Sequence, residues 1–291
     1  MTLSSLRSKS HLLLLLMGLG LAAPSAFAQT LTITGGQGQL LTPLQQSQPL
    51  TVQLLDSTGQ PIVGASLTYT ITDSLGLYFI NNVQPAVTDS NGNASSYIYG
   101  AGLVQGQSAP FDSATVTVNY GNAAATFYET TSGVTSTGTP LVTPSFAFLN
   151  SFQAVTGAAG STSGTPLQVA VNSISGGVPN VALSLVLDPS STGTISCAEG
   201  PSPLTNALGI AICTPVFGKV GSGTFTVSIG GFNSQIPISF TVTVGPPALI
   251  SITSGNNQSG TPGKQLPLPI VVVVTDLGGN PTPGVDRKSV V

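Results

Sequence analysis

LTVQLLDSTGQPIVGASLTYT, residues 50–70, holds two alternating strands that are separated by a polar turn. Apolar side chains recur at every second position of both strands: Leu50, Val52, Leu54, Ala65, Leu67 and Tyr69. A period of two is typical of a half-buried β-strand. In the turn, Gly59 allows a positive φ, and Pro61 interrupts the ladder of backbone hydrogen bonds. We therefore interpret the stretch as a β-hairpin.

The same unit recurs twice more along the chain. At a shift of 117 residues the segment around Leu50 aligns without a gap with the segment around Leu167, and at a shift of 220 residues it aligns with the segment around Ile270. A repeat of this length has the size of a domain and exceeds a solenoid unit. The chain is therefore expected to be an array of similar modules.

Composition favours an all-β class. The 291 residues include 35 Gly and 22 Pro but no Trp, and no apolar run with helical spacing follows residue 28. Short strands with turn signals about every 8 to 12 residues are typical of an immunoglobulin-like sandwich. We predict tandem immunoglobulin-like Greek-key β-sandwiches with these boundaries: signal peptide, 1–28; first sandwich, 29–130; linker, 131–144; second sandwich, 145–245; truncated third module, 246–285; artefactual tail, 286–291.

Residues 1–28 have the features of a secretory signal peptide. Arg7 and Lys9 form a charged start, residues 12–23 form an apolar core, and Ala26-Phe27-Ala28 is a small-residue cleavage site. The apolar core is too short to span a bilayer, and no later apolar segment is longer. We expect an exported chain with no membrane span in this sequence, either secreted or held at the cell surface.

The end of the sequence predicts an incomplete third module. The repeat stops at Val285, where its second strand begins, and two or three strands cannot bury a core on their own. The last six residues, DRKSVV, add three charges to an almost uncharged chain. We interpret them as an artefact of sequence assembly and expect the native protein to be longer.

The charge balance excludes nucleic-acid binding. Without Arg7 and Lys9, the exported chain keeps nine carboxylates and only four basic residues, a net charge of −5. Such a surface repels phosphate backbones and anionic lipids, and it offers no basic patch. Only 5% of the residues are charged, far below the ordinary share of about a quarter, so solubility must come from uncharged polar groups.

The turn residues resemble those of a known family. An alternating strand followed by D-x-x-G-x-P-x-x-G, and later by T-D-x-x-G-x-A, is matched by Asp56, Gly59, Pro61, Gly64, Thr88, Asp89, Gly92 and Ala94. This pattern resembles the bacterial immunoglobulin-like domain family Big-1, the module of intimin and invasin stalks. The resemblance implies a surface stalk with an adhesive or spacing role. The second repeat departs from it, with Ser173, Val178 and Val181 at the places of Asp, Pro and Gly.

Residue types limit the possible catalytic chemistry. The only histidine, His11, belongs to the signal peptide, so Ser-His-Asp triads, Cys-His pairs and the usual zinc sites are excluded from the exported chain. Two pairs of carboxylates remain as candidates for acid and base: Asp56 with Asp73, and Asp89 with Asp112. No Trp accompanies either pair. We expect no enzyme activity and no cofactor.

Four residues are weak candidates for binding a cation: Asp56, Asp89, Asn91 and Asp276. Asp89, Asn91 and the following Asn93 have the D-x-N-x-N spacing of a calcium loop. The glycine and the distal glutamate of such a loop are missing, however, and Asn91-Gly92 is a strong hairpin-turn signal. For Asp56 and Asp276, a turn in which the carboxylate accepts nearby backbone N–H groups competes with a cation site. We favour the turn in each case.

Cys197 and Cys213 are the only thiols in the chain. In an exported protein they are expected to form one disulfide that joins two strands across the TNALG turn. A free redox-active pair is the alternative, but no nearby base would lower the pKa of a thiol.

We therefore predict a non-catalytic secreted or surface protein that acts as an adhesin stalk, spacer or interaction module. Its partner would be a protein or glycan at the cell surface. The alternative is an accessory region of a secreted polysaccharide-degrading enzyme whose catalytic domain lies downstream. A third hypothesis, a pair of carbohydrate-binding modules, is disfavoured by the absence of Trp.

Overall fold

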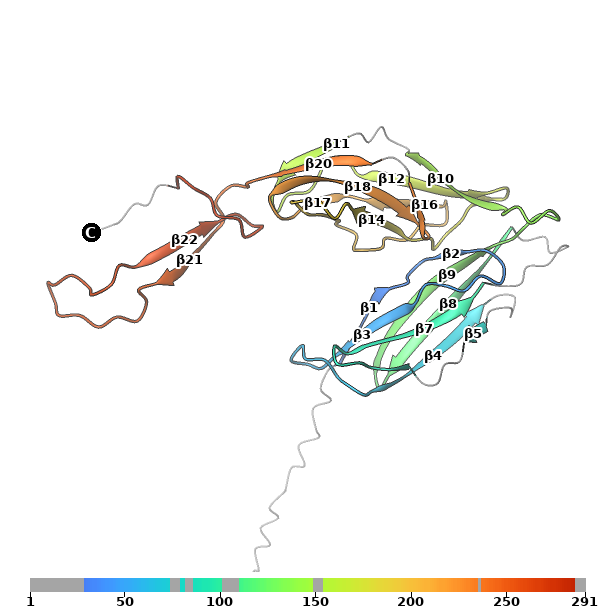
Figure 1. The fold of residues 1–291 in the computed structure, drawn as a ribbon, viewed down its shortest axis with the longest axis horizontal. Coiled ribbons are helices and arrows are strands. Elements are labelled where there is room, and N and C mark those ends of the chain that lie inside the picture. The colour runs from blue at the N-terminus through green and yellow to red at the C-terminus, as the bar shows by residue number, and fades with distance from the viewer. Residues whose placement is uncertain are drawn as a thin grey trace, which may run out of the picture.

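The computed structural model describes residues 29–73, 79–81, 86–100, 110–148, 154–234 and 237–285. Every regular element in these ranges is a β-strand, so the all-β prediction is confirmed. The predicted signal peptide, 1–28, and the predicted tail, 286–291, lie outside the described residues. Figure 1 shows two β-sandwiches and a two-stranded ribbon that projects from the second one.

The first sandwich, sandwich 1, has two sheets packed face to face. One sheet has the strand order β1-β3-β7-β5 and the other has the order β2-β9-β8-β4-β6. The strands are β1 (Thr30–Gly35), β2 (Leu40–Leu41), β3 (Leu50–Leu55), β4 (Ser66–Asp73), β5 (Phe79–Asn81), β6 (Ala86–Val87), β7 (Asn93–Tyr99), β8 (Phe111–Tyr120) and β9 (Ala123–Ser132). An A-B-E-D sheet facing a G-F-C sheet is the immunoglobulin arrangement. The immunoglobulin-like prediction is therefore confirmed for this sandwich.

The two strands of residues 50–70 do not form the predicted hairpin. β3 pairs with β1 and β7, whereas β4 pairs with β6 and β8 in the opposite sheet. The connection between them crosses from one sheet to the other. Alternation marks the inward faces correctly, since Leu54 and Leu67 are both buried in one core. The prediction of a hairpin is wrong because a period of two does not identify the neighbouring strand.

The second sandwich, sandwich 2, is built on the same plan. Its sheets are β10-β12 with β13 and β16, and β11-β20-β18-β14 with β19, together with the small pair β15-β17. The strands are β10 (Val142–Phe148), β11 (Ala154–Ala158), β12 (Leu167–Ser173), β13 (Gly176–Gly177), β14 (Leu183–Leu187), β15 (Ile195–Cys197), β16 (Ile210–Cys213), β17 (Pro215–Phe217), β18 (Gly221–Ile229), β19 (Phe232–Asn233) and β20 (Ile238–Thr243). The pair Leu167 and Cys213 repeats the pair Leu50 and Ser96, both at a shift of 117 residues.

The segment predicted as a linker, 131–144, is ordered. β9 continues to Ser132, and β10 begins at Val142. Between them the chain folds back on itself, because the Leu141 N–H donates to the Gly133 carbonyl and Val134 forms a bridge with Pro140. A short closed turn therefore connects the two sandwiches.

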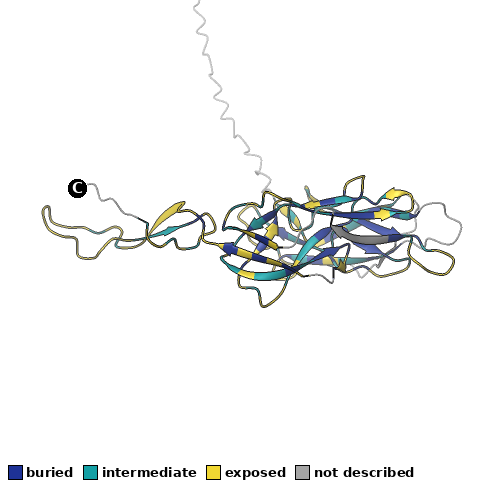
Figure 2. Cartoon of the chain, turned by 90° about the horizontal axis from the view of Figure 1, so that it is seen from above, coloured by how far each residue is buried: buried dark blue, intermediate teal, exposed yellow. Residues whose placement is uncertain are grey.

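The ribbon consists of β21 (Leu249–Ser254) and β22 (Val271–Thr275). It repeats the start of sandwich 1 in detail: Gln258 Nε2 donates to the Gly255 and Leu268 carbonyls, as Gln39 Nε2 does to the Gly36 and Gln48 carbonyls. Figure 2 shows that the ribbon is largely exposed or half-buried, whereas the sandwich strands carry buried residues along their length.

Candidate functional site

Asp56 lies in a turn that its own carboxylate holds together. Asp56 Oδ1 accepts hydrogen bonds from the Thr58 N–H at 2.8 Å, the Thr58 hydroxyl at 2.7 Å and the Gln60 N–H at 2.9 Å. The hydroxyl of Thr58 contributes most to holding the pKa of Asp56 below its ordinary value, and the backbone N–H groups add to the effect. Asp56 Oδ1 is thus committed to the turn, in agreement with the turn interpretation.

The calcium-loop candidate at Asp89 and Asn91 is also a turn. Asp89 Oδ1 accepts from the Asn91 and Asn93 N–H groups at 2.8 and 2.9 Å, and the Asn91 carbonyl accepts from Gln53 Nε2. The turn joins β6 to β7, which belong to different sheets. Here Asn91-Gly92 marks a turn, as expected, but the turn does not close a two-residue hairpin.

Asp276 follows β22 and lies in the equivalent turn of the ribbon. Its Oδ1 accepts from the Asn280 N–H at 2.8 Å and from Asn280 Nδ2 at 3.0 Å. Burial acts to raise the pKa of Asp276, but hydrogen bonds from Gly245, Asn280 and Gly278 outweigh it and hold the pKa below its ordinary value. Within the described residues, no three His, Cys, Asp or Glu side chains gather in a way that could hold a metal ion.

The two predicted carboxylate pairs are not brought together. Asp56 lies at the end of sandwich 1 where β4 begins, and Asp73 lies at the other end of β4. Asp89 lies at the Asp56 end, because the Leu54 N–H donates to the Gly92 carbonyl, whereas Asp112 pairs with Thr131 at the far end of β8. Strands rise about 3.3 Å per residue, so roughly 20 Å separates the members of each pair. A glycosidase needs carboxyl groups within about 10 Å of each other, and neither pair fits.

The structure joins Cys197 and Cys213 by a disulfide, with 4.9 Å between the two Cα atoms. Cys197 lies in β15 and Cys213 in β16, and both side chains belong to the core of sandwich 2. The bond links the β12-β16 sheet to the separate β15-β17 pair. It is a structural clip at the edge of a sheet.

Strand β2 belongs to a sheet of sandwich 1 and also contacts sandwich 2. Leu40 and Leu41 pair in parallel with Thr130 and Thr131 of β9 in sandwich 1. Successive side chains of a strand point to opposite sides, and each leucine is only 3% exposed. Leu41 packs into the core of sandwich 1, whereas Leu40 packs into the core of sandwich 2. Figure 1 shows β2 lying between the two sandwiches.

Backbone hydrogen bonds extend this contact into sandwich 2. The Leu40 N–H donates to the Gly230 carbonyl at 3.0 Å, and the Ala182 N–H donates to the Gly38 carbonyl at 2.8 Å. The Thr130 hydroxyl donates to the Pro179 carbonyl at 3.4 Å. The segment 38–41 therefore bridges the two sandwiches and fixes their relative position. No sequence pattern predicts this contact, since the pair LL at 40–41 is too short for a periodic signal.

Two adjacent glycines allow a test of this contact. A Cβ atom on Gly230 would lie 2.6 Å from Leu40 Cβ, whereas a Cβ on Gly231 would meet nothing within 4 Å; both residues have a positive φ. Gly230→Ala is therefore expected to lower the free energy of unfolding by roughly 1 to 3 kcal/mol more than Gly231→Ala, because both variants place a side chain at a positive φ, of 56° and 94°, but only Gly230→Ala adds a clash. Urea unfolding followed by circular dichroism measures the difference. Equal losses in the two variants would contradict the shared contact.

Glu129 lies beneath the bridging segment and was not predicted as a site. The residue is fully buried, and its Oε2 accepts from the Gln39 N–H at 2.9 Å. Its Oε1 has no hydrogen-bond partner among the described residues. Burial raises the pKa of Glu129 well above its ordinary value, and the backbone N–H groups of Gln39 and Gly38 only partly oppose this effect. Asp112, on the neighbouring strand, is a second buried titratable group at this end of sandwich 1.

The raised pKa predicts that this site stabilises the protein most in acid. The folded protein favours the neutral carboxyl of Glu129. The contribution of Glu129 to the free energy of unfolding is therefore complete below the ordinary Glu pKa of 4.5, and it is lost as the pH rises through the raised pKa of the folded state. Glu129→Gln is expected to remove this loss. Urea unfolding between pH 4 and pH 8, about the range in which a raised Glu pKa would act, measures it. A wild-type profile that does not fall more with pH than the Glu129→Gln profile would contradict the prediction.

Glu199→Gln is the matched control for that experiment. At Glu199 burial acts to raise the pKa, but hydrogen bonds from the Thr214 hydroxyl and N–H outweigh it and hold the pKa below its ordinary value. Its contribution is therefore present above the unfolded pKa and lost as the pH falls through the folded pKa. Glu199→Gln should therefore change the profile only below the ordinary Glu pKa of 4.5, where the measurement is extended to lower pH, whereas Glu129→Gln changes it above that value.

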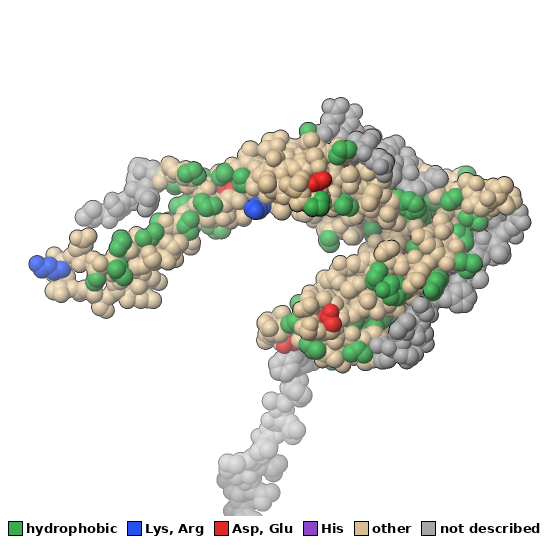
Figure 3. Space-filling model, viewed as in Figure 1, with side chains coloured by type: hydrophobic (Ala, Val, Ile, Leu, Met, Phe, Trp, Pro, Cys, Tyr) green, Lys and Arg blue, Asp and Glu red, His purple; other side chains and the backbone are tan. Residues whose placement is uncertain are grey.

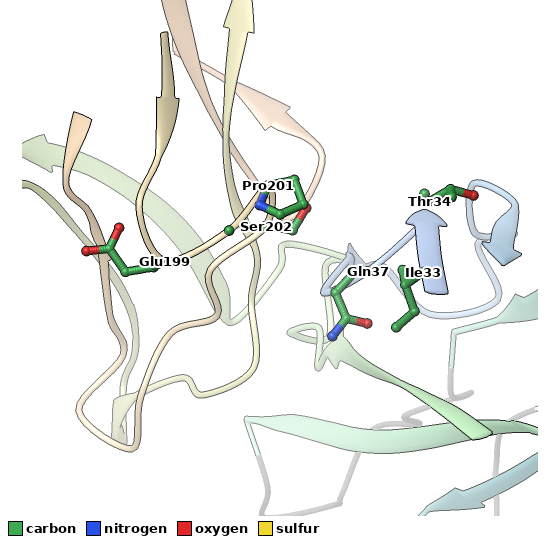
Figure 4. Close-up of a pocket in the computed structure, with 8 residues that line it drawn as sticks. Ile33, Thr34, Gln37, Glu199, Pro201 and Ser202 are labelled. Atoms are coloured by element: carbon green, nitrogen blue, oxygen red, sulfur yellow. The ribbon is translucent and has the colours of Figure 1, made fainter. Parts of the chain in front are cut away.

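A cavity of about 200 Å³ lies between the two sandwiches. Its lining comes from both: Ile33, Thr34, Gly35 and Gln37 of sandwich 1, and Glu199, Gly200, Pro201 and Ser202 of sandwich 2. Figure 4 shows the labelled side chains on the two sides of this gap. Its one charged lining group, the Glu199 carboxylate, is held by Thr214. The cavity thus presents a mainly apolar wall with no acid-base pair.

Comparisons with known proteins find similarity only among solved structures. No protein-family model matches the chain, and no curated protein matches it. Domains 4 and 5 of the S-layer protein SbsC are 16% identical to it with a TM-score of 0.26, covering 75% of this chain and 98% of that one. InvD of Yersinia pseudotuberculosis is 16% identical with a TM-score of 0.24, covering 87% and 72%. The D00-D0 domain of intimin is 12% identical with a TM-score of 0.22, covering 74% and 97%.

Proposed function

We propose that this chain is a non-catalytic stalk or spacer of the Big-1 type, secreted or held at the cell surface, in which rigidly joined sandwiches set the distance between two attachment points. The observation that carries the proposal is the shared strand β2. Leu40 and Leu41 each fill a different core, so one sandwich cannot swing against the other without opening a core. A spacer that holds a distance needs this property, whereas a flexible linker does not provide it.

The positions of the polar groups support the same function. The carboxylate pairs that might have served as acid and base lie at opposite ends of sandwich 1, and the Asp56 and Asp89 carboxylates hold turns together. Figure 3 shows a visible face on which charged side chains are few and scattered. Nor does any helix in the described part of the chain have the length and apolar character to cross a membrane. The side chains thus maintain the framework, which is the role of a stalk.

The module boundaries of the proposal are 29–130, 145–245 and 246–285, preceded by a signal peptide at 1–28. The ribbon supports a third module, because β21, β22 and the Gln258 hydrogen bonds repeat β1, β3 and the Gln39 hydrogen bonds. A surface glycan or protein would contact the exposed turns at the ends of the sandwiches.

Labelling of intact cells tests the location and the function together. Antibodies raised against residues 29–245 are expected to label intact cells of the native host or to detect the chain in its medium, and surface protease is expected to remove the label. Beads coated with residues 29–245 should bind glycans or proteins on a cell surface, and they should release no sugar from those glycans. Retention of the chain inside the cell, or release of reducing sugar from a polysaccharide, would contradict the proposal.

A further inference from the structure

The ribbon meets sandwich 2 through the turn that follows β22. Only residues 244–248 separate the end of β20 from the start of β21. In this short connection, the Gly245 N–H donates to Asp276 Oδ2 at 2.9 Å. Asp276 is 0% exposed, although it belongs to the turn of an otherwise exposed ribbon. The sandwich that precedes the ribbon therefore covers Asp276, whereas Leu277, Gly278 and Gly279 of the same turn remain exposed.

A second contact comes from the opposite side of the turn. Asn280, whose side chain also donates to both Asp276 oxygens, accepts through Oδ1 from the Val220 N–H at 3.4 Å. Val220 immediately precedes β18. The turn is thus held both by the segment that follows β20 and by the segment that precedes β18.

The two surfaces also fit closely in shape. A Cβ atom on Gly160 of sandwich 2 would lie 2.6 Å from Leu277 Cβ, and a Cβ on Gly278 of the turn would lie 2.9 Å from Ala159 Cβ. Glycine on each side therefore lets the two backbones approach. We call the surface of sandwich 2 that contacts this turn the socket. It consists of Ala159–Gly160, Gly218–Val220 and Gly245.

Sandwich 1 contains the same turn without the socket. The Asp56 N–H donates to the Gln60 carbonyl and the Gly59 N–H to the Asp56 carbonyl, as the Asp276 N–H does to the Asn280 carbonyl and the Gly279 N–H to the Asp276 carbonyl. Asp56, however, is half-buried where Asp276 is buried, and the hydrogen bonds that its Oδ1 accepts come from Thr58 and Gln60 of its own turn. The turn is intrinsic to the repeat, whereas the contact with a neighbouring sandwich is specific to Asp276.

We infer that the Asp276–Asn280 turn is a docking element, and that the socket of sandwich 2 is an interaction surface for a D-x-G-G-N turn of the following module. The Asp276 carboxylate fixes the connecting segment by holding the Gly245 N–H, and the glycine contacts set the orientation. The partner that fits the socket is a loop with an aspartate, two glycines and an asparagine. This inference concerns the junction itself and holds whether or not the chain is a surface stalk.

Amide hydrogen exchange of Gly245 in the full mature chain tests the inference. Asp276→Ala is expected to accelerate this exchange roughly ten- to hundredfold, the effect of losing a hydrogen bond to a charged group. Asp56→Ala is the matched control, because it removes the same turn chemistry and leaves the junction intact. Unchanged protection of Gly245 in Asp276→Ala, or equal acceleration in both variants, would overturn the inference.

A second pair of variants separates loss of docking from loss of the ribbon. Gly160→Ala places a methyl group against Leu277 without altering the turn, whereas Gly138→Ala has the same positive φ of 82° and meets nothing within 4 Å. Gly160→Ala should accelerate exchange at Gly245 while the Thr282 N–H, which donates to the Val274 carbonyl within the ribbon, stays protected. Protection of Gly245 in Gly160→Ala equal to that in Gly138→Ala would contradict the inference.

Discussion

Leu40→Ala is expected to destabilise sandwich 2 by about 2 to 5 kcal/mol, the usual cost of truncating a fully buried leucine, although residue 40 lies about a hundred residues before that sandwich begins. The reason is that the Leu40 side chain belongs to the core formed by residues such as Val181 and Ile229. Leu41→Ala is the matched control. It removes the same side chain from the next position and is expected to destabilise sandwich 1 by a similar amount.

Hydrogen-exchange mass spectrometry resolves the two effects by segment. In Leu40→Ala, exchange should rise first in peptides that cover β12 and β18, and in Leu41→Ala it should rise first in peptides that cover β3 and β8. If Leu40→Ala loosens only sandwich 1, or if the two variants give the same pattern, β2 does not serve two cores and the proposed rigid spacer loses its main support.

Removal of the disulfide is expected to have the second-largest effect. Cys197 and Cys213 are 16 residues apart in sequence, and closing a loop of this size stabilises a fold by roughly 3 kcal/mol on the chain-entropy account. The double variant Cys197→Ala, Cys213→Ala should lower the free energy of unfolding of sandwich 2 by about this amount, with a small additional loss because both side chains are buried.

Reduction of the wild-type protein provides the control, because it opens the same loop without changing a side chain. Reduced wild type and the double variant should unfold at similar urea concentrations, while sandwich 1 keeps its own transition. Mass measurement of the native protein after alkylation should show no modified thiol. Two alkylated cysteines in the unreduced protein, or a double variant as stable as the wild type, would contradict the expectation.

Local sequence pattern predicted which side chains face the core, but it did not predict which strands pair. Leu50, Val52 and Leu54 are all fully buried, as their alternation requires. The hairpin interpretation failed because two strands that face one core from opposite sheets show the same alternation as two neighbours in one sheet. Strand pairing depends on contacts far apart in sequence, such as Leu50 with Ser96.

One irregularity in the sequence has a simple structural explanation. At a shift of 117 residues, Leu183, Leu185 and Leu187 are out of phase with Leu67, Tyr69 and Ile71. In the structure the Val181 N–H donates to the Thr205 hydroxyl, as the Ala65 N–H does to the Thr88 hydroxyl. The crossing connection of sandwich 2 is thus one residue shorter than that of sandwich 1. β14 recovers the inward phase, with Leu183 buried as Leu67 is.

The candidate sites were predicted unevenly. The turn interpretation of Asp56 and Asp89 agrees with their hydrogen bonds, because an aspartate that accepts nearby N–H groups acts within a few residues of itself. Leu40, Glu129 and the burial of Asp276 were not foreseen. In each case the deciding contacts come from Gly230, Gln39 or Gly245, which no local pattern connects to them.

The shared strand also bears on how the chain matures during synthesis. Leu40 leaves the ribosome early, but Gly230, whose carbonyl accepts the hydrogen bond from the Leu40 N–H, follows 190 residues later. At about 5 to 20 residues per second this delay lasts roughly 10 to 40 seconds. Throughout that interval the nascent amino-terminal domain carries an uncovered leucine beside unpaired backbone groups. Such a surface invites aggregation or capture by a chaperone, so the rate of elongation and the supply of holdases should influence the yield of this protein more than its final stability would suggest.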